Sequence, residues 1–209
     1  MTRRLHLVRH GEVHNPEHVV YGTLPGFVLS AAGRAHAQAA GRRLRELVSG
    51  PPCIVSSPLE RAQETAAIIA RTFGEDVNVT TDERLIEARS FAMGLPRRFA
   101  PHLYLRRMLQ TNRPRNESPT AIVDRMVEAA RAACGPHPDA ILVSHQFPIW
   151  MARLGLENGH ENGLAQHARA FVARRAPFLF LRERCVPGSI TTILLDDPRP
   201  HTTTYWEPC

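Results

Sequence analysis

The stretch LVRHGE, residues 7–12, ends a short apolar run with an arginine, a histidine and a glycine. The apolar residues 5–8 predict a buried strand, and we expect Gly11 to end that strand by adopting backbone angles that other residues avoid. Arg9 and His10 then lie side by side at the carboxyl end of a strand. Ligands of open α/β sheets bind at such ends, so this stretch indicates both a fold class and the place of a site.

A second apolar run, AILVS at residues 140–144, ends in the same way at His145. Two histidines therefore follow two predicted strands, and Arg9 stands beside the first of them. Guanidinium groups pair well with phosphate oxygens, and histidine is one of the side chains that can act as a nucleophile. The two strand ends together predict a phosphate site.

Apolar runs alternate with helix-like segments along the chain, which favours a parallel-rich sheet with helices on both faces. We expect three helices to begin with the caps Ser30, Ser57 and Ser118, the second with Pro58 at its first position. The expected strands lie at 5–8, 53–56, 77–80, 140–144, 178–181, 190–195 and 203–206, and the expected helices at about 30–48, 57–74, 118–133 and 148–156. The predicted fold class is α/β, a three-layer sandwich with a mostly parallel central sheet.

The length of 209 residues suits one domain, which we expect to span residues 1–209. Residues 91–119 contain four prolines and two arginine pairs. We interpret them as a lid-like insertion that covers the site rather than as a separate domain. Long ordered loops inside compact domains are usually functional, so the loop 14–29 is expected to shape the mouth of the site.

All 26 basic residues are arginines, and the formal net charge is +6. The arginines are spread along the chain, mostly in ones and twos, which argues against a nucleic-acid-binding surface. No apolar segment approaches the ~20 residues that a membrane helix needs, and the N-terminus does not resemble a signal peptide. We therefore expect a cytoplasmic protein without nucleic-acid or membrane partners. The sequence does not indicate its oligomeric state.

Histidines recur at every fourth position near the N-terminus, at residues 6, 10, 14 and 18. On a helix this spacing would form one metal-binding face. Gly11 and Pro16 interrupt the segment, however, and the apolar run before His10 indicates a strand. Zinc sites also need a compact third and fourth ligand, so we expect no metal site.

Phosphoryl transfer suits these residues better than metal binding. A histidine nucleophile must be neutral at one ring nitrogen, and the ordinary pKa of about 6.5 allows this near neutral pH. The carbonyl of Gly11 could accept the proton on the other nitrogen of His10. Arg9, Arg61 and a protonated His145 could neutralise the phosphoryl oxygens. A carboxylic acid must then protonate the leaving alkoxide.

Three motifs occur in order along the chain: RHGE at residues 9–12, SSPLERAQETA at 56–66 and VSH at 143–145. They resemble the three signatures of the histidine phosphatase superfamily, in its phosphoglycerate mutase-like branch. The linking stretches LSAAG at 29–33 and DERLIE at 82–87 also resemble that branch. RHG alone is a weak signal, whereas three motifs in order, each at the end of a predicted element, are specific. The resemblance implies a phosphoglycerate mutase-like fold.

The resemblance also implies a role for each matching position and no metal or organic cofactor. His10 would form a phosphohistidine, and Glu87 would protonate the leaving group and then activate water. The implied catalytic residues are His10, Arg9, Arg61, Glu87 and His145, and Asn15 would contact the phosphate. Asn15 stands one residue nearer to His10 than the family pattern has it. The backbone N–H of Gln146 could add a second substrate-binding donor at the start of the next helix.

The chain departs from the branch after Glu87. Members often have a Phe-Glu-Gly or Trp-Glu-Gly element there, and this chain has FAMG at residues 91–94, which lacks the second carboxylate. The difference concerns contacts to the substrate more than the phosphoryl chemistry.

We therefore expect a metal-independent phosphomonoester hydrolase that acts on a small phosphorylated metabolite through phosphorylated His10. One alternative is a phosphoglycerate mutase, which returns the phosphoryl group to its substrate and must exclude water. The arginine pairs within 91–119 leave that alternative open. Another is a non-catalytic phospho-ligand-binding protein on the same fold. An arginine-rich rim suits acidic substrates and does not separate sugar phosphates, phosphoglycerates and nucleotides.

Overall fold

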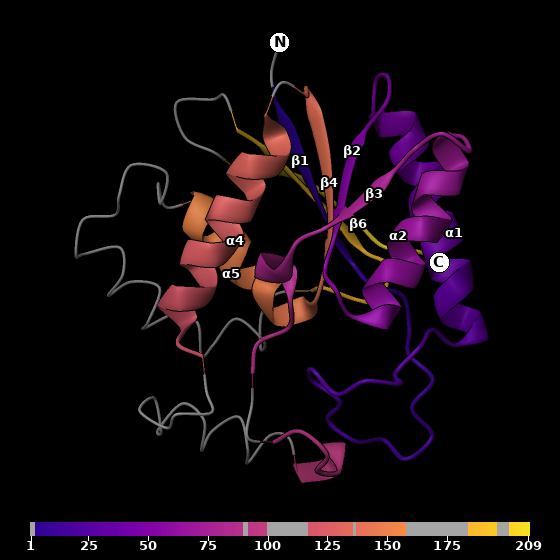
Figure 1. Cartoon of the computed structure of the whole chain (residues 1–209), viewed down its shortest axis with the longest axis vertical. Coiled ribbons are helices and arrows are strands. Elements are labelled where there is room, and N and C mark those ends of the chain that lie inside the picture. The colour runs from indigo at the N-terminus through magenta and orange to yellow at the C-terminus, as the bar shows by residue number, and fades with distance from the viewer. Residues whose placement is uncertain (1–2, 90–91, 100–116, 136, 158–183, 196–200) are drawn as a thin grey trace.

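The described strands of the computed structural model form one six-stranded sheet, in the order β3-β2-β4-β1-β5-β6 (Figure 1). The structure describes residues 3–89, 92–99, 117–135, 137–157, 184–195 and 201–209. The strands are β1 (Arg4–Arg9), β2 (Cys53–Ser56), β3 (Val79–Thr81), β4 (Asp139–Ser144), β5 (Ile190–Leu194) and β6 (His201–Trp206). The helices are α1 (Ala31–Leu47), α2 (Glu60–Phe73), α4 (Pro119–Cys134) and α5 (Gln146–Glu157), with the 3₁₀ turns η1 (Glu83–Leu85) and η2 (Arg97–Phe99).

Four neighbouring strands of the sheet are parallel, and the pairing of β5 reverses direction. β3, β2, β4 and β1 pair in parallel, whereas β5 pairs antiparallel with both β1 and β6. The prediction of a mostly parallel sheet is confirmed. Parallel neighbours need crossover connections, and in this chain α1, α2 and α4 lie in those connections.

Two apolar cores lie on opposite faces of the sheet. Helices α1 and α2 cover one face and α4 and α5 cover the other, so the molecule has three layers (Figure 1). β1 contributes side chains to both cores, because alternate side chains of a strand point to opposite faces of the sheet. Leu5 and Leu7 pack with residues of α4 and α5, and Val8 packs with residues of α1 and α2.

The register of the sheet brings three carboxyl strand ends together. The N–H of His10 donates to the carbonyl of Ser144 (3.1 Å), so the ends of β1 and β4 are adjacent. The N–H of Ser57 donates to the carbonyl of Val143 (2.9 Å), which places the end of β2 beside β4. The residues that follow these three strands therefore meet at one edge of the sheet.

Two of the three predicted caps are confirmed. The hydroxyl of Ser30 accepts from the N–H of Gly33, and the hydroxyl of Ser118 accepts from the N–H of Ala121. The prediction for Ser57 is wrong: α2 begins at Glu60, and its cap position, Leu59, has no capping side chain. Several other boundaries also differ: α5, for example, begins at Gln146 rather than at 148, and β3 lies at Val79–Thr81 rather than at 77–80.

Gly11 is needed for space rather than for backbone freedom. It is absent from the glycines with positive φ, so the predicted reason is wrong. A Cβ atom on Gly11 would instead lie 2.2 Å from the carbonyl oxygen of Gly33, in the first turn of α1. A glycine at this position lets the chain after β1 pass directly against the start of α1.

Two predicted features fall largely outside the described residues. These are the strand 178–181 and most of the insertion 91–119, of which the structure describes 92–99 and 117–119. In the described part of the chain, none of the helices has the length and apolar character needed to cross a membrane.

Candidate active site

His10 follows β1 and presents one ring nitrogen as a hydrogen-bond acceptor. Its Nδ1 lies 2.7 Å from the carbonyl oxygen of Gly11, and its Nε2 lies 3.3 Å from Nε of Arg61. A carbonyl can only accept and a guanidinium can only donate, so the proton of the neutral ring resides on Nδ1. The predicted contact with Gly11 is confirmed. The contact leaves the lone pair on Nε2, facing Arg61.

The surroundings of His10 keep its ring neutral. The side chain is buried, and this burial lowers its pKa well below the ordinary value, with the charges of Arg61 and Arg9 acting in the same direction. The hydrogen bond to Gly11 acts in the opposite direction but is the smaller effect. A neutral imidazole with a fixed proton is the form that can attack phosphorus.

Arg61 joins the two histidines of the site. It lies in the first turn of α2, is only 1% exposed, and places Nη2 3.2 Å from Nδ1 of His145. The same Nη2 donates to the carbonyl of Gly22 (2.6 Å), and the ring of Tyr21 lies 4.7 Å from the centre of the guanidinium. A buried cation that touches two neutral imidazoles is suited to receive an anion.

Thr65 ties this part of α2 to the chain after β1. Its hydroxyl donates to the carbonyl of Arg61 (2.7 Å) and accepts from the N–H of Gly11 (3.1 Å). Arg61 and His10 are therefore held at a fixed spacing by one buried side chain.

His145 follows β4 and is neutral, in contrast to the protonated ring that the sequence led us to expect. Burial lowers its pKa well below the ordinary value, and the charge of Arg61 is the next largest cause. Because Nδ1 accepts from Arg61, the proton lies on Nε2, which donates to the hydroxyl of Ser57 (2.8 Å). The ring centroids of His10 and His145 are 5.1 Å apart.

Arg9 has an unpaired N–H group at the site. Its Nη1 donates to the carbonyl of Cys185, while its buried Nε has no hydrogen-bond partner among the described residues. The charge of Arg9 lowers the pKa of both His10 and His145, so it acts on the same small region. A buried donor without a partner is costly, and a bound anion would satisfy it.

Burial lowers the pKa of Arg61 below its ordinary value, and the charge of Glu87 opposes part of this shift, so Glu87 lies within electrostatic reach of Arg61. Its Oε1 accepts from the N–H of the next residue, Ala88 (2.8 Å), and the side chain is half-buried. The carboxylate thus lies near Arg61. Its role as the acid stays a prediction.

The two predicted substrate-binding residues differ in what the structure shows. Gln146 is the first residue of α5, so its N–H belongs to the first turn, where the helix supplies no acceptor. The side chain of Asn15, by contrast, bonds to the backbone of Val19 at both ends: Nδ2 donates to the carbonyl (2.9 Å) and Oδ1 accepts from the N–H (3.1 Å). Asn15 here shapes the loop, and its contact with phosphate stays a prediction.

The described start of the insertion packs on the loop that reaches the site. The N–H of Val20 donates to the carbonyl of Leu95 (2.8 Å), and the N–H of Arg97 donates to the carbonyl of His18 (2.7 Å). The sulfur of Met93 accepts from the hydroxyl of Thr23 (3.2 Å). These contacts join the described start of the insertion to the loop 14–29, and the role of 91–119 as a lid stays a prediction.

Sequence reasoning overlooked three site residues: Ser57, Thr65 and Tyr21. The first two lie within the motif SSPLERAQETA, whose match could have indicated them, but the position of Ser57 before Pro58 suggested a cap. Tyr21 lies in the loop 14–29, which we expect to shape the mouth of the site, but no pattern in that loop indicated the place of Tyr21 over Arg61.

The predicted absence of metal remains a prediction. His6 is buried in β1, where its ring contacts Thr192 Oγ1 (3.0 Å) and Asp139 Oδ1 (3.3 Å). His10, in contrast, contacts Arg61 and Gly11. Among the described residues, no group of three or more histidine, cysteine, aspartate or glutamate side chains is placed to hold a metal ion.

Three buried histidines make stability depend on pH. Burial lowers the pKa of His6, His10 and His145 in the folded chain, so the unfolded chain takes up protons first as the pH falls. Above about pH 6.5, the pKa of histidine in the unfolded chain, these three rings do not change the free energy of unfolding with pH. Below that pH each of the three histidines lowers the free energy of unfolding by up to about 1.4 kcal/mol per pH unit.

We expect urea unfolding to show this decline between about pH 7 and about pH 5, with a shallower slope in His145→Gln. A free energy of unfolding that stays level over this range would contradict the assignment of neutral buried rings.

The family model described as "Histidine phosphatase superfamily (branch 1)" matches residues 5–170. An uncharacterized protein of Mycobacterium tuberculosis is 35% identical over 218 residues, which cover 98% of this chain and 96% of the relative. A probable phosphoglycerate mutase, GpmB of Salmonella paratyphi C, is 38% identical over 161 residues, or 70% of this chain and 71% of the relative.

Solved structures agree in fold. A mycobacterial glucosyl-3-phosphoglycerate phosphatase in complex with VO3 is 25% identical, with a TM-score of 0.70 over 99% of this chain and 100% of that one. A phosphoserine phosphatase of Entamoeba histolytica, in complex with 3-phosphoglyceric acid, is 20% identical, with a TM-score of 0.72 over 99% of this chain and 98% of that one. The match over residues 5–170, together with the site at the ends of β1, β2 and β4, shows that the chain belongs to branch 1 of the histidine phosphatase superfamily.

Proposed function

We propose that this protein is a metal-independent phosphomonoesterase that acts on a small phosphorylated metabolite in the cytoplasm through a phosphohistidine at His10. The observation that carries the proposal is the lone pair on His10 Nε2. It faces Arg61 at 3.3 Å, while the Nδ1 proton is held by Gly11 at 2.7 Å. A nucleophile and a phosphate-binding cation therefore already lie in contact.

In the first half-reaction the lone pair of His10 Nε2 attacks phosphorus. A bond between nitrogen and phosphorus forms as the bond between phosphorus and the leaving oxygen breaks. Glu87, protonated, gives its proton to that oxygen, so that an alcohol leaves rather than an alkoxide. Arg9 and Arg61 neutralise the charge on the transferred oxygens, and the N–H of Gln146 adds a donor at the start of α5.

In the second half-reaction Glu87, now a carboxylate, takes a proton from water. The oxygen of that water attacks phosphorus, the bond to His10 Nε2 breaks, and inorganic phosphate forms with the neutral ring restored. Glu87 regains its proton in this step, so the cycle closes without any other reactant. His145 takes part through charge: a phosphate dianion nearby favours its protonated form, whose positive charge then adds to that of Arg61.

A second candidate function has its own support. The relative named as a probable phosphoglycerate mutase is 38% identical over 70% of this chain, which favours return of the phosphoryl group to the substrate. Both reactions begin with the same phosphorylated His10. They differ in whether water or a second hydroxyl attacks it, and hence in how well the site excludes water.

The test is a panel of sugar phosphates, phosphoglycerates, phosphoserine and an aryl phosphate, assayed with a chelator present. We expect the wild type to release phosphate and His10→Ala to release none. Isomerisation of a phosphoglycerate faster than phosphate release would establish the mutase instead. Binding of a phosphorylated ligand with neither reaction would show a binding protein and contradict both.

A further inference from the structure

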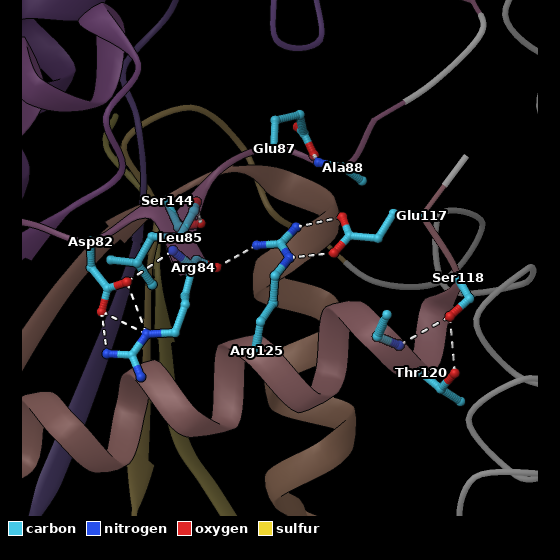
Figure 2. A network of polar contacts seen from close by, with 11 residues as sticks. Asp82, Arg84, Leu85, Glu87, Ala88, Glu117, Ser118, Thr120, Arg125 and Ser144 are labelled. Atoms are coloured by element: carbon cyan, nitrogen blue, oxygen red, sulfur yellow. Dashed lines mark hydrogen bonds and ion pairs between the residues drawn. The ribbon is translucent and has the colours of Figure 1, made fainter. Parts of the chain in front are cut away.

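The segment that carries Glu87 has little regular structure of its own. It contains the short turn η1 and then continues to Glu87 without a helix or a strand. An acid that must meet a leaving oxygen needs a fixed position, because small displacements of catalytic groups cost large factors in rate. In this protein, side chains from other elements of the fold hold the segment before Glu87 in place (Figure 2).

Arg125 of α4 reaches across to this segment. Its Nη1 donates to the carbonyl of Arg84, the middle residue of η1 (Figure 2). Its other groups are held by Glu117, which accepts from Nε at 2.6 Å and from Nη2 at 3.0 Å. The guanidinium thus has both ends tied, one to the residue before the Ser118 cap and one to the turn before Glu87.

Ser144 ties the next carbonyl of the same turn. Its hydroxyl donates to the carbonyl of Leu85 at 2.7 Å, and Ser144 immediately precedes His145. The segment before Glu87 is therefore bonded directly to the end of β4, next to His145. Leu85 itself is fully buried in the core.

A third tie joins the side chain of Arg84 to its surroundings. It pairs with Asp82 at 2.7 Å and with Glu128 of α4 at 3.0 Å. These two ion pairs are partly exposed, and the side chain of Glu128 is 70% exposed, so they contribute less than the more buried contacts of Arg125 and Ser144. The carbonyl contacts of Arg125 and Ser144 are therefore the main contacts that fix this segment.

We propose that Arg125 is a positioning residue: by holding the carbonyl of Arg84, it sets where Glu87 presents its carboxyl group to the leaving oxygen. Ser144 assists through the carbonyl of Leu85. The proposal rests on the proposed function, because it needs Glu87 to act as the acid. The side-chain contacts of Arg125 are with Glu117 and Arg84, so it acts on the reaction only through Glu87.

Positioning of an acid has a specific kinetic signature. A poor leaving group such as an alkoxide needs the proton, whereas a nitrophenolate leaves well without it. Loss of the tie should therefore slow hydrolysis of alkyl phosphates much more than that of p-nitrophenyl phosphate. A merely structural role would slow both substrates alike.

The experiment is a double-mutant cycle of Arg125→Met with Glu87→Gln, measured on an alkyl phosphate and on p-nitrophenyl phosphate. We expect Arg125→Met to lower kcat/KM for the alkyl substrate about 10-fold in the wild type and less than about 2-fold in the Glu87→Gln background. With p-nitrophenyl phosphate we expect a loss of less than about 3-fold in either background. Arg131→Met, which changes an exposed arginine in the last turn of the same helix, is the matched control.

Ser144→Ala is the second variant, since it removes one hydroxyl and leaves the ion pair of Arg125 intact. Ser144→Ala should also lower kcat/KM more for the alkyl phosphate than for p-nitrophenyl phosphate, by a smaller factor than Arg125→Met. Equal losses from Arg125→Met in both backgrounds, or on both substrates, would overturn the positioning role. If Glu87→Gln itself fails to discriminate between the substrates, the acid assignment fails and the positioning role with it. Full activity of His10→Ala would be a different failure, that of the proposed function.

Discussion

His10→Ala is expected to lower kcat/KM for phosphate release by a factor on the order of 10⁴ or more, because the covalent intermediate of the proposed mechanism forms on this ring. The neutral ring, its proton fixed by Gly11 and its Nε2 facing Arg61, is the part of the site that a different side chain cannot imitate. Steady-state release of phosphate from the best substrate of the panel measures the effect.

The matched control is His137→Ala, which removes an exposed histidine ahead of β4. It should leave kcat/KM unchanged. Phosphate binding, followed by calorimetric titration, should survive in part in His10→Ala because Arg9 and Arg61 remain. A His10→Ala variant with wild-type turnover would show that the phosphoryl group is never carried by this ring.

Arg61→Lys is expected to lower kcat/KM by about 10²–10³-fold, although the positive charge is retained. Arg61 contacts His10 through Nε, and His145 and the carbonyl of Gly22 through Nη2, which a lysine ammonium on a flexible stem cannot reproduce. The loss should fall on kcat as well as on KM, since the fork stabilises charge that shifts during transfer.

Arg71→Lys on the last turn of the same helix provides the control, because Arg71 is exposed and remote from the histidines in sequence. Inhibition by inorganic phosphate should weaken in Arg61→Lys and stay constant in Arg71→Lys. Activity of Arg61→Lys within about 3-fold of the wild type would mean that charge alone, without the geometry of the guanidinium, is sufficient at this site.

The fold and the centre of the site could be predicted because local patterns determine them. Each parallel strand that bears a site residue is a short apolar run that ends abruptly, and parallel strands place their carboxyl ends at the same edge. His10 and His145 meet for that reason, after β1 and β4, which are neighbours in the sheet. The hydrogen bond from His10 to Gly11 joins adjacent residues, so it too could be expected from the sequence.

The residues that hold the site together depend on tertiary contacts, and the sequence did not reveal them. Ser57 before Pro58 is a typical helix cap, yet its hydroxyl bonds to His145, which is 88 residues away in the chain. Arg125 is one of two arginines of α4, and only the packing of α4 against η1 distinguishes it. The neutral state of His145 follows from complete burial beside Arg61, which no local pattern reports.

The most direct test of the account is chemical trapping of the phosphoenzyme. The wild type is mixed with its best substrate, quenched in alkali during turnover, and digested for mass spectrometry, with His10→Ala treated in parallel. We predict one alkali-stable, acid-labile phosphoryl group on the peptide that contains His10, formed at a rate no slower than kcat and absent from the variant. Steady phosphate release with no phosphoryl group on His10, or with the group on another residue, would contradict the claim that this histidine carries the reaction.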